Sequence, residues 1–180
     1  SRWIECRSSN VECGGEGLFA RGDIASGTIV AFYNGIRIPF EFGGPKEIWS
    51  SSGYKIFINA DYESGERMNI PEELTSLTKY CASLGHKMNH SFEPNCTEWF
   101  FHHPRFGIIP CERALRDIKD GEELFLDYEY DPHNCPEWFS SELNTFLSKN
   151  DDDESKISLL ARNTKYLRYN EYLISLNNNK

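Results

Sequence analysis

Three absences narrow the class of protein before any motif is considered. The 180-residue chain has no run of about 18 apolar residues, so the sequence predicts no transmembrane helix. Ser1 is not followed by a charged and then an apolar region, so no secretory signal peptide is expected. No cluster of Lys and Arg occurs either, which argues against direct binding of nucleic acid and leaves no basic nuclear address. These absences favour an intracellular protein that binds neither membrane nor nucleic acid.

Cysteine is present, but not as a disulfide scaffold or a zinc finger. The six cysteines include no C-x-x-C pair, which favours a reduced protein with buried thiols. His86 and His90 stand four residues apart, yet Lys87 occupies the place of the glutamate that a zinc protease has after its first histidine. We therefore expect no metal, and a zinc hydrolase using His86 and His90 is kept only as an alternative.

Charge and hydrophobicity indicate a folded domain with a basic partner. Acidic side chains outnumber basic ones by 28 to 19, which gives a formal net charge of -9. A hydrophobic share of 39% is enough to build the core of one compact domain. The acidic excess favours a Lys- and Arg-rich peptide as partner, because complementary charge speeds encounter.

Short strands are expected through most of the chain. Alternating or β-branched segments between turn residues predict strands at residues 28–35, 55–60, 106–115 and 122–130. A polar surface excursion is expected at residues 61–71, and apolar residues at helical spacing predict helices at residues 74–84 and 138–147. The pattern indicates a mostly-β domain with few short helices.

Four motifs follow one another in an order that makes them specific together. GGEGLF begins at Gly14, YNG begins at Tyr33, and YCASLGHKMNHSFEPNC begins at Tyr80. The fourth, ELFLDYEY, begins at Glu123. Together they resemble the SET-domain protein lysine methyltransferases, most of all the branch of histone lysine monomethyltransferases that carry MORN repeats. The resemblance covers about residues 10 to 147.

The resemblance implies a fold and a division of the chain. The fold is the SET domain (β-clip), with small curled sheets around a threaded C-terminal segment. Residues 1–148 would form this catalytic domain, closed by the aromatic segment PEWF. Residues 149–180 would form an acidic linker, beginning with DDDE at Asp151, and an amphipathic C-terminal helix whose Leu and Tyr residues recur every seven positions. That helix either packs on its own domain or offers a site to a partner.

The implied reaction is methyl transfer from S-adenosylmethionine to a lysine of a histone tail or another basic peptide, by a monomer in the nucleus or the cytoplasm. Free lysine has a pKa of about 10.4, so the amine must lose its proton before it can attack. A dry aromatic channel beside a positive sulfur lowers that pKa, because both disfavour the ammonium ion. Position and desolvation then suffice, without a metal.

The resemblance also assigns the site residues. Tyr128 is the catalytic tyrosine that orients the lysine, and Tyr33 and Tyr130 line its channel. The expected cofactor contacts come from the glycine loop (GGEG, residues 14–17), from the NHS segment (residues 89–91) with the preceding Lys87, and from one helix face. They are Gly14, Gly15, Glu16, Lys87, Asn89, His90, Trp138 and Glu142. Trp138 and Glu142 are four residues apart and share a helix face, as an adenine platform requires.

Glu98 departs from the family pattern, which has a tyrosine at this position that shapes the lysine channel. The number of methyl groups transferred is therefore left open. An alternative also stays open, in which a catalytically weakened SET module binds a lysine-containing peptide without turnover.

Overall fold

The computed structural model describes residues 3–38, 55–57, 67–70, 75, 83–130 and 135–149. The chain divides into two compact units, Ser1–Asp127 and Tyr128–Lys180, and each is described by itself. Almost all the described secondary structure is β, in three small sheets that belong to the first unit. The mostly-β prediction is confirmed.

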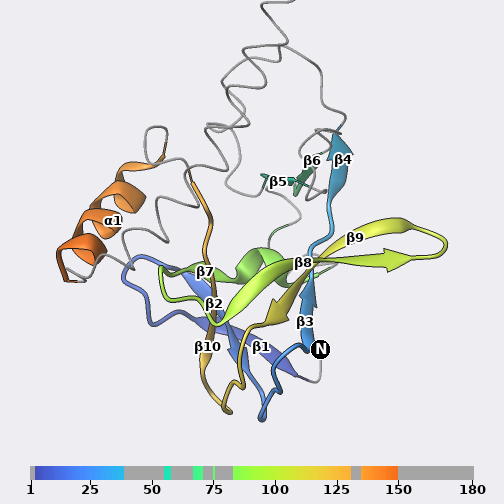
Figure 1. Ribbon diagram of the computed structural model, residues 1–180, viewed down its shortest axis with the longest axis horizontal. Coiled ribbons are helices and arrows are strands. Elements are labelled where there is room, and N and C mark those ends of the chain that lie inside the picture. Colours follow the sequence, from blue (N-terminus) through green and yellow to red (C-terminus); the bar gives the residue numbers. More distant parts are fainter. Residues whose placement is uncertain are drawn as a thin grey trace, which may run out of the picture. The chain divides into compact units, whose positions relative to one another are not determined.

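The first sheet brings together motifs that are far apart in the sequence. Its order is β1 (Ile4–Ser8), β2 (Glu16–Ala20), β10 (Glu123–Leu126) and β7 (Asn89–His90). β10 pairs antiparallel with β2 and parallel with β7, so it lies between the glycine-loop strand and the NHS strand (Figure 1). This sheet is the frame of the candidate site.

The other two sheets are antiparallel and have three strands each. The larger has the order β3 (Ile29–Phe32), β9 (Gly107–Ala114) and β8 (Cys96–His103). β8 and β9 form a hairpin whose register runs from Cys96 opposite Ala114 to His103 opposite Gly107 (Figure 1). The smaller has the order β4 (Ile36–Ile38), β6 (Arg67–Asn69) and β5 (Lys55–Phe57).

The core of the first unit is formed by apolar residues of these strands and of the segments that join them. Burial of such apolar side chains is worth roughly 25 cal/mol for each Å² removed from water. The main cluster contains Ile4, Leu18, Ala20, Ile24, Val30, Ala31, Met88, Cys96, Ala114, Ile118 and Leu124. Met88 lies between the short 3₁₀ helix η3 (Gly85–Lys87) and β7, so its burial anchors the NHS segment to the core.

The second unit contains the helix α1 (Glu137–Lys149). The helix starts after Pro136, whose carbonyl oxygen accepts hydrogen bonds from the amides of Phe139 and Ser140. Phe139 and Leu143 are four residues apart and both buried, so they form the apolar face of the helix. Glu137 in the first turn and Lys149 in the last complement the helix dipole.

Most expected elements are present, and two expectations need correction. The expected strands contain β3, β5, β9 and β10, and the helix expected at 138–147 is α1. Residues 67–69, expected in a surface excursion, form β6 because Met68 packs with Tyr33 and Ile70. β8 was not expected, because CTEWFF places aromatic residues in succession and hides the period of two.

Several expectations concern residues outside the described ranges. These are the acidic linker, the C-terminal helix and most of the helix expected at 74–84. The threading of the C-terminal segment stays a prediction. None of the helices among the described residues has the length and apolar character needed to cross a membrane.

Candidate functional site

The glycine loop between β1 and β2 is a tight turn with left-handed backbone. The amide of Ser9 donates to the carbonyl of Gly15 at 2.9 Å, which closes the loop. Cys13 has a φ of 60° and Gly15 a φ of 62°. A Cβ on Gly15 would meet no atom within 4 Å, so the backbone at this residue faces open space and can approach a bound molecule closely.

A buried carboxylate, Glu123 at the start of β10, holds this loop in place. Ser9 Oγ donates to Glu123 Oε1 at 2.5 Å, and the amide of Asn10 donates to Oε2 at 2.9 Å. Asn89 Nδ2 donates to Oε1 at 3.4 Å from the other side, in β7. One carboxylate therefore ties the loop to the NHS strand, and hydrogen bonds to a charged group are the stronger kind.

Gly17 is the position at which this arrangement tolerates no side chain. A Cβ there would collide with the Glu123 carboxylate and would lie 3.2 Å from Asn89 Nδ2. The third glycine of GGEG is therefore required by the packing of Glu123, whereas Gly15 is required by its φ.

The loop carries an ion pair at its tip. Lys87 Nζ lies 2.7 Å from Glu16 Oε2, and the Lys87 side chain is only 10% exposed. Asn89 Nδ2 also donates to the backbone carbonyl of Glu16 at 3.1 Å. The site thus presents a largely buried ammonium group next to accessible backbone, a combination that suits a carboxylate ligand.

His90 points away from this loop, into a buried environment of its own. Its Nδ1 lies 3.8 Å from Asp127 Oδ1, and its ring meets Phe92 edge to face at a centroid distance of 4.4 Å. A carboxylate near one ring nitrogen favours the tautomer that carries its proton there. His90 therefore helps to hold the end of β10 at Asp127.

Tyr33 lies in a separate cluster of the same unit. Its amide donates to the carbonyl of Pro110, and its ring meets His86 edge to face at 6.4 Å. Met68 and Ile70 pack beside it. Burial lowers the pKa of His86, which favours a neutral imidazole next to the tyrosine.

Glu98 and Glu112 form a pair of acidic residues directly opposite each other on β8 and β9. Glu112 is 2% exposed, and its Oε2 makes no hydrogen bond within the described part of the chain. Burial, and then the nearby Glu98, raise its pKa well above the ordinary value of 4.5. Both causes favour the protonated form of the Glu112 carboxyl group.

Buried thiols surround this pair. Burial, with Glu112 as the next cause, raises the pKa of Cys96 to about 12 and that of Cys111 to about 11. Both thiols thus stay protonated, while Cys13 in the glycine loop is exposed. The expectation of free, buried thiols is confirmed for Cys96 and Cys111 and is wrong for Cys13, which belongs to a surface turn.

Three expected site residues of the second unit meet in one aromatic cluster. The Tyr128 ring lies edge to face with Tyr130 at 5.8 Å and with Trp138 at 6.2 Å. Tyr130 also meets Trp138 at 6.1 Å and Phe139 at 5.2 Å. Burial, and then the nearby Cys135, raise the pKa of Tyr130. Trp138 remains 43% exposed, and Glu142 is exposed on the same helix.

The expected site residues thus fall into three groups. Gly14, Gly15, Glu16, Lys87 and Asn89 share the loop-and-strand site, with His90 as its neighbour in the chain, while Tyr33 has its own cluster. Tyr128, Tyr130 and Trp138 meet in the second unit. No group of three or more His, Cys, Asp and Glu in the described ranges is arranged to hold a metal ion.

Two buried glutamates were not expected as part of the site. Glu123 is the first residue of the ELFLDYEY motif. An acidic residue at the start of an apolar strand indicates a buried carboxylate with a hydrogen-bond partner inside the protein, here Ser9. Glu112 sits in a similar apolar segment, GIIPCERA, directly after the buried residues Pro110 and Cys111. An acidic residue on the buried face of a strand indicates a special environment, because its carboxylate must either form hydrogen bonds or take up a proton.

Comparison with known proteins places these groups in context. The SET domain family matches residues 15–129. A curated protein named histone-lysine N-methyltransferase SETD7, from Halocynthia roretzi, is 39% identical over 155 residues, which cover 81% of this chain and 39% of that protein. The chain thus spans about two fifths of the length of this relative.

Solved structures of similar fold come from polycomb complexes. A humanized mutant of the Chaetomium thermophilum Polycomb Repressive Complex 2 bound to the inhibitor GSK126 matches with a TM-score of 0.53 and 26% identity, over 71% of this chain and 15% of that one. The ctPRC2 structure in an autoinhibited conformation bound to S-adenosylmethionine has a TM-score of 0.54 and 24% identity, over 81% and 17%. The second likeness concerns the fold alone.

Proposed function

Because the chain belongs to the SET-domain family, we propose that it transfers a methyl group from S-adenosylmethionine to the side-chain amine of a lysine in a protein. The observation that carries the proposal is the loop-and-strand site, in which Lys87 pairs with the Glu16 carboxylate and Asn89 donates to the Glu16 backbone carbonyl. The named relative is a histone-lysine methyltransferase, which supports the same activity here.

The residues present fit the amino-acid end of the cofactor. S-Adenosylmethionine supplies, when bound, a methyl group on a positive sulfur. The Lys87 ammonium would pair with its carboxylate, and the open backbone at Gly15 would allow close approach. Asn89, held by Glu123, would keep the loop in register. Gly14 and Glu16 take part through their backbone, and His90 takes part as the buttress of β7 and β10.

The aromatic residues are proposed to prepare the lysine. Tyr128 orients the amine, and Tyr33 and Tyr130 line its channel. Aromatic rings exclude water while their faces tolerate a cation, so they favour loss of the lysine proton without trapping the amine. Trp138 offers a half-exposed ring for the adenine, with Glu142 on the same helix. The mutual edge-to-face packing of Tyr128, Tyr130 and Trp138 supports a shared role.

The substrate is proposed to be a basic, lysine-containing segment such as a histone tail, read by a monomer in the nucleus. The net charge of -9 favours such a segment, and the relative's name supports it. Residues 1–148 would form the catalytic domain of the MORN-repeat branch, and residues 149–180 a linker and helix that offer a partner site. S-Adenosylmethionine is the cofactor, and no metal takes part in the reaction.

A second candidate function rests on Glu98. This exposed residue lies opposite the buried acid Glu112, where the family pattern has a tyrosine. A carboxylate there can hold a lysine ammonium and so oppose the loss of its proton. The chain would then bind a lysine-containing peptide and turn it over slowly or not at all.

One experiment separates the two functions. Cofactor binding is measured by calorimetry, and an array of lysine peptides is then incubated with trideuteromethyl-labelled S-adenosylmethionine and analysed by mass spectrometry. Labelled lysine supports the enzyme and also counts the methyl groups, with Lys→Arg peptides as the control. Cofactor and peptide binding without label supports the binding module. Absence of cofactor binding contradicts the enzyme.

A further inference from the structure

One face of the β3–β9–β8 sheet carries a row of large aromatic side chains toward solvent. Trp99, Phe101 and His103 alternate along β8 and therefore lie on the same face. Phe32 of β3 joins them, because Phe32 and Trp99 both stand opposite Cys111 of β9. Phe106 lies in the turn of the hairpin. We call the residues Phe32, Trp99, Phe101, His103 and Phe106 the aromatic face.

These side chains are ordered by contact with one another, yet they remain open to solvent. The Phe101 ring meets Phe32 edge to face at 6.1 Å, and His103 stacks on Phe106 at 4.7 Å. Trp99 and the three phenylalanines are between 38% and 60% exposed. Isolated exposed aromatic residues need no explanation, but a contiguous row of them marks an interaction surface.

The charge of this face is opposite to that of the chain as a whole. The Arg113 guanidinium lies 3.6 Å from the Trp99 ring centre, and that of Arg105 lies 5.3 Å from Phe106. Thr97 stands opposite Arg113, so Arg113 shares the face of Trp99. Glu98 and Glu112 fall at the alternate positions and belong to the other side. Within the described strands β3, β8 and β9, this face carries no carboxylate.

The contrast in charge identifies the partner. We propose that the aromatic face docks a short acidic segment of another protein, in which Asp or Glu alternates with large apolar side chains. Guanidinium groups held over aromatic rings present donors to carboxylates, and the rings between them receive the apolar side chains. A lysine-rich segment would be repelled here, so the face is not a second substrate groove. This proposal does not depend on methyl transfer.

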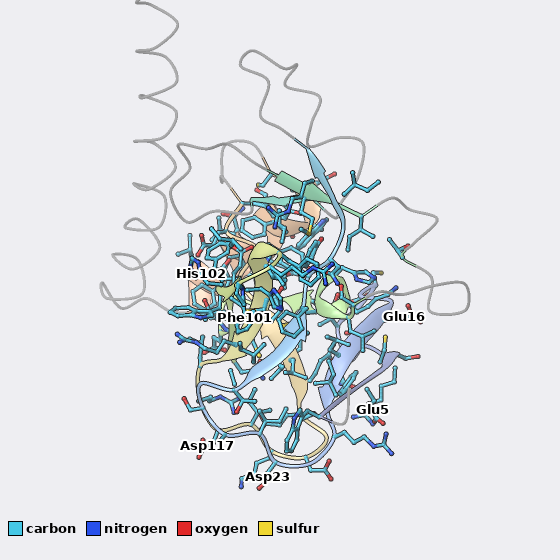
Figure 2. The ribbon with its side chains drawn as sticks, turned by 90° about the vertical axis from the view of Figure 1, so that its right-hand side faces the viewer. Glu5, Glu16, Asp23, Phe101, His102 and Asp117 are labelled. Atoms are coloured by element: carbon cyan, nitrogen blue, oxygen red, sulfur yellow. The ribbon has the colours of Figure 1, made fainter. Side chains whose placement is uncertain are left out.

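The face is also separate from the cofactor loop. Phe101 lies well apart from Glu16, which marks the tip of that loop (Figure 2). His102 follows Phe101 in β8 and therefore points to the opposite face of the strand. The proposed docking surface thus leaves the loop-and-strand site accessible. Nucleic acid is the less suitable ligand, because neutralising a run of phosphates needs clustered Lys and Arg, and the described residues of this face supply two arginines.

The test uses a fluorescein-labelled peptide of alternating Glu and Leu or Phe, with a matched peptide that has Lys in place of Glu. Fluorescence anisotropy should show saturable binding of the acidic peptide only. We expect Trp99→Ala, and Arg105→Glu combined with Arg113→Glu, each to weaken it at least tenfold. Arg113→Lys should weaken it less, because it keeps the charge and loses the planar stack. His102→Ala on the opposite face is the control and should bind like the wild type.

Circular dichroism and thermal melting of each variant separate loss of docking from loss of fold. The single-residue variants Trp99→Ala and Arg113→Lys keep the test valid where the double charge reversal is poorly folded. Absence of binding, equal binding of the two peptides, or unchanged affinity in Trp99→Ala would overturn the proposal. Stronger binding of a single-stranded oligonucleotide would also overturn it, as would a dimer in sedimentation that Trp99→Ala dissociates.

Discussion

The carboxylate of Glu123 occupies the space next to the Cα of Gly17 that a side chain at position 17 would need. The same carboxylate accepts hydrogen bonds from Ser9 and Asn10 at the start of the glycine loop, and from Asn89 in β7. The Glu123 carboxylate thus holds both the loop and the NHS strand, and it fits between them because position 17 is a glycine. The first prediction follows from this contact.

Gly17→Ala should abolish high-affinity cofactor binding while the protein stays folded. The added methyl group must displace Glu123, which releases the hydrogen bonds of the loop, and overpacking of this kind costs about 1–3 kcal/mol. Calorimetry with S-adenosylmethionine measures the effect. Gly107→Ala is the control, since its φ of 72° makes the substitution strained although a Cβ there would meet no atom within 4 Å. It should lower the melting temperature and leave cofactor affinity unchanged.

Substitutions of Glu16 and Lys87 should change cofactor affinity in opposite directions. Lys87→Met removes the ammonium group and should weaken binding about tenfold or more, as expected for loss of one charge-assisted hydrogen bond. Glu16→Gln removes the competitor that holds Lys87 Nζ at 2.7 Å, so binding should become tighter. Titration at low and high salt measures both. Weaker binding in Glu16→Gln would mean that its side chain contacts the cofactor directly.

Tyr128→Phe should cut methyl transfer by about 10²-fold or more, the range seen when one positioned proton-transfer or hydrogen-bonding group is removed. Cofactor affinity should stay within a few fold, because the ring and its edge-to-face contacts with Tyr130 and Trp138 are kept. Single-turnover transfer of a labelled methyl group separates the two effects. Full turnover in this variant would remove Tyr128 from the proposed mechanism, and Tyr130→Phe is the matched comparison.

Glu112→Gln should remove a pH dependence of stability. Because the pKa of Glu112 is raised, the folded protein holds this proton to a higher pH than the unfolded chain, in which the ordinary pKa is 4.5. The stability due to the protonated acid is therefore fully present below pH 4.5 and is lost as the pH rises toward the folded pKa. In that pH window, the free energy of unfolding of Glu112→Gln should rise relative to that of the wild type by up to about 1.4 kcal/mol per pH unit.

Urea unfolding of both proteins at several pH values between 5 and 8 measures this gain. Glu93→Gln changes an exposed glutamate and is the control for the loss of one carboxylate. A constant difference between Glu112→Gln and the wild type would show that Glu112 is ionised in the folded state.

Much of the fold was predictable because its strands have local signals. Residues 28–35 and 106–115 are β-branched or alternating and bounded by glycine, and both contain strands. β8 lacks such a signal, because both faces of this strand carry aromatic residues. The succession Trp99–Phe100–Phe101 therefore shows no alternation of apolar and polar residues. β6 was hidden by polar neighbours, and its packing partners Tyr33 and Ile70 explain why Met68 is buried.

The site was predictable in composition but not in its internal contacts. The motifs identified Glu16, Lys87 and Asn89, and the structure brings these residues together. That Glu123 is the central acceptor depends on β10 lying between β2 and β7, a pairing of distant segments that no local pattern encodes. The same holds for Glu112, whose raised pKa follows from burial rather than from its neighbours in sequence.

The parallel pairing of β10 with β7 has a consequence for how the protein is made. It joins Phe125 to Asn89 and Leu126 to His90, and the whole β8–β9 hairpin lies between the two strands in the chain. Such a pairing forms late in folding, because the long segment between the two strands must be ordered first. A nascent chain still short of residue 126 would hold every residue of the glycine loop and the NHS segment without the strand that joins them. Ribosome-bound intermediates should therefore gain cofactor affinity abruptly, when β10 emerges, rather than in proportion to their length.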